Sequence, residues 1–313
     1  MAENIKDIKN IAVIGAGLMG HGIAQIFALQ GYSVSLMDLN DELLSKALEN
    51  IRSNLTLMSQ KGIARLDDIE PALGRIRTTI DLNEAAAGAQ FVLEAVLENL
   101  ELKQNIFKEL DALCPEGTIL ATNTSVISIT EIAEKAKIRA RILGTHFWNP
   151  PYLIPLVEVI RGEDTSDDAM DATFELLKHV GKHPVRVNKD VPGFVGNRLQ
   201  HALWREAISI VEKGIADPAT VDECIRFGFG LRLPVLGPLE TADMVGTDLT
   251  LAIHDYILKH LERSPDPSPL LRKKVESGEL GFKTGIGFQE WSPEEAQRSR
   301  KRLQEYLLKV TKG

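Results

Sequence analysis

A histidine and a glutamate separated by a short stretch are the first candidates for chemistry in this sequence. His146 and Glu158 both lie in GTHFWNPPYLIPLVEVI, residues 144–160. Glu158 interrupts an apolar run typical of a buried strand, where a carboxylate is costly unless another group pairs with it. If His146 ends one strand and Glu158 lies on the next, the carboxylate can fix the tautomer of the imidazole and stabilise the imidazolium. Such a pair could take the proton of an alcohol during hydride transfer.

The same segment also has a plainer interpretation. Glu158 could face water from a partly exposed strand, with His146 as a structural residue at a strand end. Single polar residues are more often structural than catalytic, so the segment taken alone favours this second interpretation.

A glycine-rich turn near the N-terminus predicts a dinucleotide site. Residues 11–38, IAVIGAGLMGHGIAQIFALQGYSVSLMD, have the pattern strand, turn, helix, strand. Such glycines allow a tight turn, close approach to a pyrophosphate and close helix packing, and the helix N-terminus attracts phosphate. Asp38 stands where a ribose-binding carboxylate is expected and would repel the 2′-phosphate of NADP, so the expected cofactor is NAD. The turn contributes Gly15, Ala16, Gly17, Leu18, Met19 and Gly20 to the predicted site.

The elements that must position these groups follow an α/β pattern. Short β-branched runs alternate with helical stretches from Ile11 to about Val187, which predicts βαβ units and a mostly parallel sheet. The pattern changes at DVPGFVGNRL, where Pro192 and Gly193 break the chain and helical patterns follow. One predicted helix covers residues 240–261, and IGFQEW near the end is the one possible strand after the break. Apolar stripes on these helices suggest a dimer.

Composition argues against nucleic acid and membrane as partners. The 313 residues carry a net charge of −8, with no basic cluster. Cys114 and Cys224 lie far apart without metal-ligand spacing, so we expect free thiols, no metal and a reducing compartment. No apolar run is as long as a membrane span, and the N-terminus lacks the apolar core of a signal peptide. We therefore expect a cytoplasmic protein.

Two further polar groups have ambiguous roles. Glu98, Glu101 and Lys103 begin a predicted helix, where acidic residues often do no more than complement the helix dipole. The residues Asn123, Thr124 and Ser125 follow a strand, as helix-capping residues do. They also lie at the carboxyl edge of the predicted parallel sheet, where ligands bind.

Several motifs together resemble the L-3-hydroxyacyl-coenzyme A dehydrogenase family from one end of the chain to the other. They are, in order, IAVIGAGLMGHGIAQ, LEAVLENLELK, ATNTSVISIT, GTHFWNPP with LVEVI, GKHPVRVNKDVPGFVGNRL and GFKTGIGF. The resemblance implies a Rossmann-like, mostly parallel α/β domain that binds NAD, at residues 1–189. An all-helical domain at residues 190–313 would bind substrate and dimerise, so a homodimer is expected.

The resemblance also implies roles for individual residues. His146 would be the acid/base, Glu158 its partner, and Ser125 and Asn197 would lie by the reacting oxygen and the substrate carbonyl. Cofactor contacts are implied for Asp38, Glu98, Lys103, Ser125, Asn149 and Lys283. The implied reaction interconverts (S)-3-hydroxyacyl-coenzyme A and 3-oxoacyl-coenzyme A with NAD.

The sequence departs from the acyl-coenzyme A pattern in ways that leave the substrate open. WNPPYLIP replaces an FNPxxxMK-like run, and Asn54 stands where a serine that contacts coenzyme A is common, although Lys61 keeps the basic position expected to bind substrate. RFGFGLRLPVLGPLET resembles the λ-crystallin and L-gulonate 3-dehydrogenase branch. Its Arg232 is either a surface residue at a helix end or a ligand for a substrate carboxylate. The alternatives are therefore a dehydrogenase of a free 3-hydroxy acid, of the gulonate or carnitine type, or a non-catalytic, crystallin-like NAD-binding protein.

Overall fold

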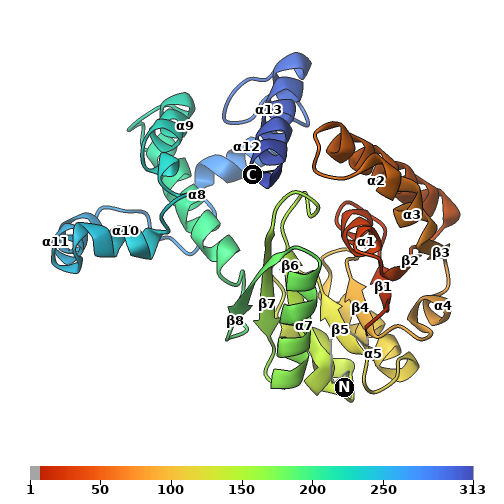
Figure 1. The fold of residues 1–313 in the computed structure, drawn as a ribbon. Coiled ribbons are helices and arrows are strands. Elements are labelled where there is room, and N and C mark those ends of the chain that lie inside the picture. The colour runs from red at the N-terminus through yellow and green to blue at the C-terminus, as the bar shows by residue number, and fades with distance from the viewer. Residues whose placement is uncertain (1–7, 313) are drawn as a thin grey trace. The chain divides into compact units, whose positions relative to one another are not determined.

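Figure 1 shows the structure of the chain, a computed structural model that describes residues 8–312. The first seven residues, where the sequence predicts no signal peptide, lie outside the described residues. The chain forms two compact units, Met1–Arg198 with Gln304–Gly313, and Leu199–Leu303. The domain bounds expected from the sequence, 1–189 and 190–313, stay a prediction.

Within residues 8–312, the first unit contains one eight-stranded sheet in the order β3-β2-β1-β4-β5-β6-β7-β8. Neighbouring strands run parallel except for β6 and β7, which are antiparallel. The mostly parallel α/β sheet expected from the sequence is therefore confirmed. The strands are β1 (Asn10–Ile14), β2 (Ser33–Met37), β3 (Ile76–Thr79), β4 (Phe91–Glu94), β5 (Ile119–Thr122), β6 (Ile142–Phe147), β7 (Leu156–Arg161) and β8 (His183–Val187).

Helices bury both faces of this sheet. One face packs against α1 (Gly20–Leu29), α2 (Asp41–Gln60), α3 (Ile69–Gly74) and α7 (Asp167–His179). The other face packs against α4 (Leu82–Ala86), α5 (Leu100–Leu113) and α6 (Ile129–Ile132). Along β1, Ile11 and Val13 enter the first core, and Ala12 and Ile14 enter the second. Burial on both faces explains why the central strands β1, β4 and β5 are apolar along most of their length.

Side-chain caps fix where several of these helices begin. Asn40, Asn99 and Ser166 each accept a hydrogen bond from the backbone N–H three residues later, at the starts of α2, α5 and α7. Such caps satisfy N–H groups that have no partner inside the helix. The cap at Asn99 is the one that bears on the site, because it fixes the start of α5 and hence the position of Lys103, one turn along the helix.

The second unit is helical, as expected. Its helices are α8 (Gly196–Glu212), which begins in the first unit, α9 (Pro218–Phe227), α10 (Pro238–Val245), α11 (Thr247–Ile257), α12 (Pro269–Glu276) and α13 (Pro293–Lys312), whose last turns count with the first unit. None of the helices in residues 8–312 combines the length and apolar composition needed to cross a bilayer.

Two details of this unit differ from the sequence prediction. The single helix expected over residues 240–261 is wrong, because α10 and α11 are separate helices with Gly246 between them. Gly246 has a φ of 106°, which interrupts helical geometry and is accessible mainly to glycine. The segment IGFQEW forms no regular strand, since Ile286 makes only isolated bridges to Gly281 and Glu290.

Candidate active site

The glycine-rich turn lies where β1 meets β4, at the point where the order of the strands reverses. Gly15 has a φ of 98°, and a Cβ atom there would lie 2.7 Å from the carbonyl oxygen of Ala95, just after β4. A Cβ atom on Gly20 would collide with the carbonyl oxygen of Gly15. Gly17 differs, because a Cβ atom there would meet nothing within 4 Å. Packing within the chain explains the first two glycines, and the open space at Gly17 fits the close approach of a pyrophosphate.

Asp38 joins the end of β2 to this turn. Its Oδ2 atom accepts a hydrogen bond from the N–H of Ala16 at 2.6 Å, and its Oδ1 atom accepts one from the N–H of Leu39 at 2.7 Å. An ionised carboxylate has about four lone-pair sites, so both oxygens can still accept a bond from a ribose hydroxyl. The turn, the N-terminus of α1 and Asp38 thus fit an NAD molecule, with Leu18 and Met19 completing the turn before the helix.

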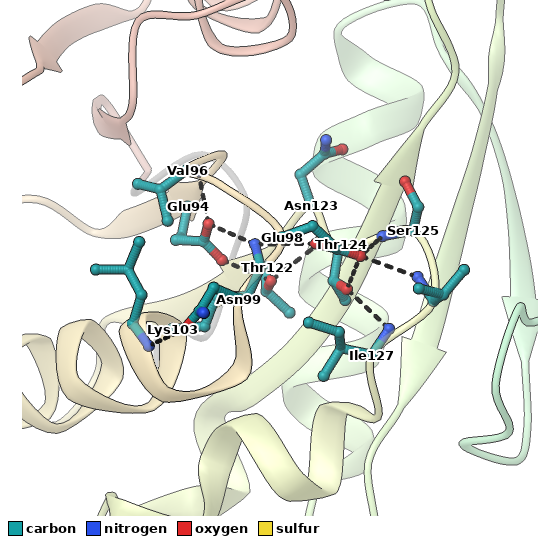
Figure 2. A network of polar contacts seen from close by, with 12 residues as sticks. Glu94, Val96, Glu98, Asn99, Lys103, Thr122, Asn123, Thr124, Ser125 and Ile127 are labelled. Carbon is teal, nitrogen blue, oxygen red and sulfur yellow. Dashed lines mark hydrogen bonds and ion pairs between the residues drawn. The ribbon is translucent and has the colours of Figure 1, made fainter. Parts of the chain in front are cut away.

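A buried ion pair lies at the end of β4, the strand next to β1 (Figure 2). Glu94, the last residue of β4, and Lys103 on α5 are each at most 1% exposed, and Lys103 Nζ donates to Glu94 Oε1 at 2.7 Å. Oε1 also accepts the N–H of Val96, and Oε2 accepts the hydroxyl of Thr122, both at 2.7 Å. Lys103, Val96 and Thr122 thus all donate to this carboxylate. Such an arrangement suits an ionised carboxylate in an interior with little water.

Glu98 continues the network toward the loop after β5. Its Oε1 atom accepts hydrogen bonds from the hydroxyl of Thr124 and from the N–H groups of Ser125 and Val126, and its Oε2 atom lies 3.4 Å from Lys103 Nζ. Burial opposes ionisation of Glu98, but these hydrogen bonds and the charge of Lys103 outweigh it and lower the pKa of the carboxyl. Glu98 and Lys103 are thus more than the solvated helix start that the sequence alone suggested.

The residues after β5 also contact Asn197 and the end of β6. The side-chain amide of Asn197 donates to the carbonyl oxygen of Ser125 at 2.9 Å, so two predicted site residues lie together. Asn123 Oδ1 accepts the N–H of Phe147 at 2.9 Å and ties the end of β5 to the end of β6, beside His146. The polar residues after β5 therefore fix the surroundings of the histidine.

His146 and Glu158 face each other directly. They are register partners in the antiparallel pair of β6 and β7, and Nδ1 of His146 lies 2.8 Å from Oε2 of Glu158. Both residues are buried, at 4% and 1% exposure. The interpretation in which Glu158 faces water is therefore wrong. The two strands lie inside the sheet, with β8 at its edge.

Glu158 also holds the start of α8. Its Oε1 atom accepts the N–H groups of Val195 and Gly196, both at 2.9 Å. Burial by itself would raise the pKa of Glu158, but the hydrogen bonds from His146 and from these two N–H groups outweigh burial and lower it. Because the ionised carboxylate can only accept, the proton of a neutral imidazole lies on Nδ1. Nε2 then carries the free lone pair that a general base needs.

Aromatic rings enclose the imidazole. The ring centroids of Trp148 and Phe194 lie 5.2 Å and 5.8 Å from that of His146. A Cβ atom on Gly196 would collide with the indole of Trp148 and would crowd Glu158 Oε2, so a glycine is needed at this position. This apolar surrounding strengthens the pair, because charges interact more strongly where water is scarce.

The remaining predicted residues have exposed side chains. Asn149 follows Trp148 in the loop after β6, and Lys61 is the residue after the last turn of α2. Lys283 and Arg232 lie in the second unit. The contacts of these four side chains with cofactor or substrate stay predictions.

Sequence reasoning missed Glu94 and Trp148. The signal for Glu94 was present, since FVLEAV places one acidic residue inside an apolar run, as in the segment with Glu158. Its partner could not be found from spacing, because Lys103 and Thr122 come from different elements. Trp148 was noted only as a departure from the family pattern.

Comparison with known proteins found matches over most of the chain. Residues 10–191 match the family model "3-hydroxyacyl-CoA dehydrogenase, NAD binding domain", and residues 193–291 match "3-hydroxyacyl-CoA dehydrogenase, C-terminal domain". A 5-formyl-3-hydroxy-2-methylpyridine 4-carboxylate 5-dehydrogenase of Mesorhizobium japonicum is 36% identical over 94% of this chain and 96% of its own length.

Two solved structures are similar over most of the chain. One is a 5-formyl-3-hydroxy-2-methylpyridine 4-carboxylic acid 5-dehydrogenase, an NAD+-dependent dismutase, with 34% identity, a TM-score of 0.89 and 97% of both chains covered. The other is an (S)-3-hydroxybutyryl-CoA dehydrogenase of Ralstonia eutropha, with 38% identity, a TM-score of 0.77, and 91% of this chain and 100% of that chain covered.

The buried pair of Glu94 and Lys103 generates a prediction. Glu94→Gln removes the negative charge that faces the buried ammonium group of Lys103, so we expect a loss of about 3–5 kcal/mol in the free energy of unfolding. Urea unfolding measures this loss, and the KM for NAD should rise with it because the turn after β4 and the end of β5 lose their contacts with Glu94. Glu101→Gln, an exposed residue in the first turn of α5, is the matched control and should change neither quantity. Equal stability of the two variants would contradict the buried pair.

Proposed function

The chain belongs to the 3-hydroxyacyl-CoA dehydrogenase family, and we propose that it oxidises a 3-hydroxy substrate with His146 and Glu158 as its acid–base pair. The cofactor predicted from the glycine-rich turn and Asp38 is confirmed as NAD. The observation that carries the proposal is the 2.8 Å contact between two buried side chains, His146 Nδ1 and Glu158 Oε2.

In the proposed reaction, His146 Nε2 removes the proton of the substrate hydroxyl, and Glu158 stabilises the imidazolium that forms. Bound NAD accepts the hydride that leaves the same carbon. In the reverse direction the imidazolium returns the proton to the new alkoxide. Trp148 and Phe194 pack against the imidazole, and exclusion of water there would favour transfer of the proton between substrate and histidine.

Ser125 and Asn197 would place the substrate. One N–H of the Asn197 amide is used by the carbonyl oxygen of Ser125. The second N–H can donate to a substrate oxygen, where it would stabilise the charge that develops during hydride transfer. The hydroxyl of Ser125 can act similarly, because Glu98 fixes the backbone of its loop.

Two substrate classes follow from the relatives. The Ralstonia eutropha enzyme is named for a coenzyme A thioester, and exposed Lys61 is the residue predicted to bind such a carrier. The Mesorhizobium japonicum enzyme is named for a pyridine carboxylate without coenzyme A. A free acid is also consistent with Arg232, whose exposed side chain makes no ion pair or hydrogen bond with any residue in 8–312. The non-catalytic alternative is less consistent with a buried, correctly oriented His146 and Glu158.

We also propose that a second copy of the chain covers the second unit, because that unit exposes many large apolar side chains. Phe227, Leu239 and Tyr256 are 73%, 81% and 75% exposed. Many exposed apolar side chains in one unit favour a surface that another chain covers, and homodimers are the commonest assemblies of soluble proteins.

The acid–base pair is tested by two substitutions. His146→Gln removes the base and should lower turnover by at least about a hundredfold, while NAD still binds in a fluorescence titration. Glu158→Gln should lower turnover by a similar factor, because an amide NH2 facing Nδ1 favours the tautomer with the proton on Nε2. The pH–rate profile of the residual activity should also change, since the amide stabilises the imidazolium less.

The matched control for the second variant is Glu163→Gln, which changes an exposed glutamate two residues beyond the end of β7. It should leave turnover and the pH profile unchanged. Full activity of both His146→Gln and Glu158→Gln would remove the pair from the mechanism.

Arg232 is tested with a panel of acidic and neutral 3-oxo compounds. Arg232→Ala should raise the KM for compounds with a free carboxylate at least about tenfold and spare neutral ones, because a bidentate contact is lost. Arg226→Ala, a second exposed arginine nearby in the chain, serves as the control. Equal losses on neutral and acidic compounds would show that Arg232 does not bind the carboxylate.

The assembly is tested by light scattering during size-exclusion chromatography. At micromolar concentration the expected particle contains two chains of 34.5 kDa. A particle with the mass of one chain at every concentration would contradict the proposed dimer.

A further inference from the structure

The side chain of Asp190 joins two segments of the first unit. Asp190 lies in the linker between β8 and α8, residues 188–195. Its Oδ2 atom accepts the hydroxyl of Ser128 at 2.6 Å and the N–H of Thr130 at 2.8 Å. Ser128 is the N-cap of α6, and its hydroxyl oxygen accepts the N–H of Glu131. One carboxylate oxygen therefore attaches the linker to the point where the loop after β5 enters α6.

The loop that Asp190 holds, residues 123–128, carries Ser125. Glu98 fixes the middle of this loop through the N–H of Ser125 (Figure 2). Asn197, which directly follows the linker as the second residue of α8, donates to the carbonyl oxygen of Ser125 at 2.9 Å. The linker and the start of α8 thus hold this loop at two points, through Asn197 at Ser125 and through Asp190 at the end of the loop.

The other end of the linker is fixed to the acid–base pair. Glu158 Oε1 accepts two N–H groups where the linker enters α8, and Glu158 Oε2 meets the imidazole of His146. The linker therefore lies between the base and the loop of Ser125, and hydrogen bonds attach it to both. A misplacement of about 1 Å between reacting groups can cost about a hundredfold in rate, so the hold on this linker matters for hydride transfer.

The second oxygen of Asp190 shows that this arrangement is not optimal for stability. Oδ1 is buried and has no hydrogen-bond partner within residues 8–312. A buried acceptor without a donor destabilises the folded chain, whereas hydrogen bonds to a charged oxygen such as Oδ2 are about twice as strong as neutral ones. Side chains that are unfavourable for local stability are expected mainly at functional sites.

We propose that Asp190 is a positioning residue, which holds Ser125 and Asn197 at the place relative to His146 that hydride transfer requires. The inference rests on the proposed function, because it concerns the same site. Within residues 8–312 the carboxylate of Asp190 bonds to Ser128 and Thr130, not to the acid–base pair. Asp190 thus acts on the reaction through the loop and the linker.

The first test compares three variants of the full chain. Asp190→Ala removes the acceptor and should lower kcat/KM for the 3-oxo compound at least about tenfold, because Ser125 and Asn197 lose their place. Asp190→Asn keeps an acceptor oxygen for both donors and should restore kcat/KM to within about threefold of the unaltered chain. Asp168→Ala, at an exposed aspartate in the first turn of α7, is the control and should change nothing.

The rates are measured as oxidation of NADH with acetoacetyl-coenzyme A and with a panel of free 3-oxo acids. Urea unfolding identifies the temperature at which every variant is folded. Asp190→Ala should keep the pH–rate profile, because His146 still meets Glu158, and should keep the Kd for NAD within about threefold in a fluorescence titration, because Asp38 and the glycine-rich turn are unchanged. A loss of stability with unchanged kcat/KM would show a structural role alone and overturn the inference. Equal losses of kcat/KM in the Asn and Ala variants would also contradict it.

Ser128→Ala decides the question if Asp190→Ala does not fold. It removes one of the two donors to Oδ2 and should lower kcat/KM about threefold. Where both variants fold, the losses of Asp190→Ala and Ser128→Ala should not add in the double variant, because both remove the same hydrogen bond. Unchanged kcat/KM in a folded Ser128→Ala protein would overturn the inference.

The outcomes separate this inference from the proposed function. Oxidation of NADH that depends on His146 but is insensitive to Asp190→Ala would support the dehydrogenase and reject the role of Asp190. Absence of NADH oxidation by the unaltered chain with every compound of the panel would reject the proposed function, and the inference with it.

Discussion

Glu158 is almost completely buried, and its two oxygens bind groups from two different parts of the first unit. One oxygen meets the imidazole of His146, and the other accepts two N–H groups at the start of α8. Burying a carboxylate is costly, and these donors offset that cost and lower its pKa, with the hydrogen bond from His146 the largest contribution after burial itself. A group with a lowered pKa stabilises the fold above its unfolded pKa and loses that contribution as pH falls through the folded value. The geometry of the acid–base pair and the start of the helix that carries Asn197 therefore depend on one ionised side chain.

A second buried carboxylate, that of Glu94, holds together the elements beside the glycine-rich turn. Glu94 ends β4, and its bonds to Lys103, Val96 and Thr122 fix the turn into α5 and the end of β5. The turn that follows it lies against Gly15, so the shape of the dinucleotide turn depends on this network as well. A buried ion pair contributes little net stability. Loss of one partner is nevertheless strongly destabilising, because the other charge is then buried without a partner. Both halves of the site are thus held by charges that have satisfied partners only in this fold.

The loop after β6 packs against several other parts of the first unit. It begins at Trp148, two residues after His146, and a Cβ atom on Gly22 of α1 would lie 2.6 Å from Pro151 in this loop. Lys182 donates to the carbonyl oxygens of Pro151 and Ile154, and burial lowers the pKa of Lys182 to about 8. Leu308 of α13 completes the packing by sharing a small core with Leu153 and Met58. The segment in which the sequence departs from the acyl-coenzyme A pattern is therefore held by α1, by Lys182 and by the C-terminal helix.

The sequence by itself determined the α/β alternation and the glycine-rich turn with Asp38, because hydrophobic periodicity and turn residues act over a few neighbours. It also located His146 and Glu158 as a possible pair. Only the tertiary structure decided that β6 and β7 run antiparallel and so place the two residues opposite each other. The partners of Glu94, the break at Gly246 and the packing of Leu308 on Met58 also depended on the folded chain. Strand direction, buried ion pairs and helix packing are set by contacts between residues far apart in the sequence, and local patterns carry no record of them.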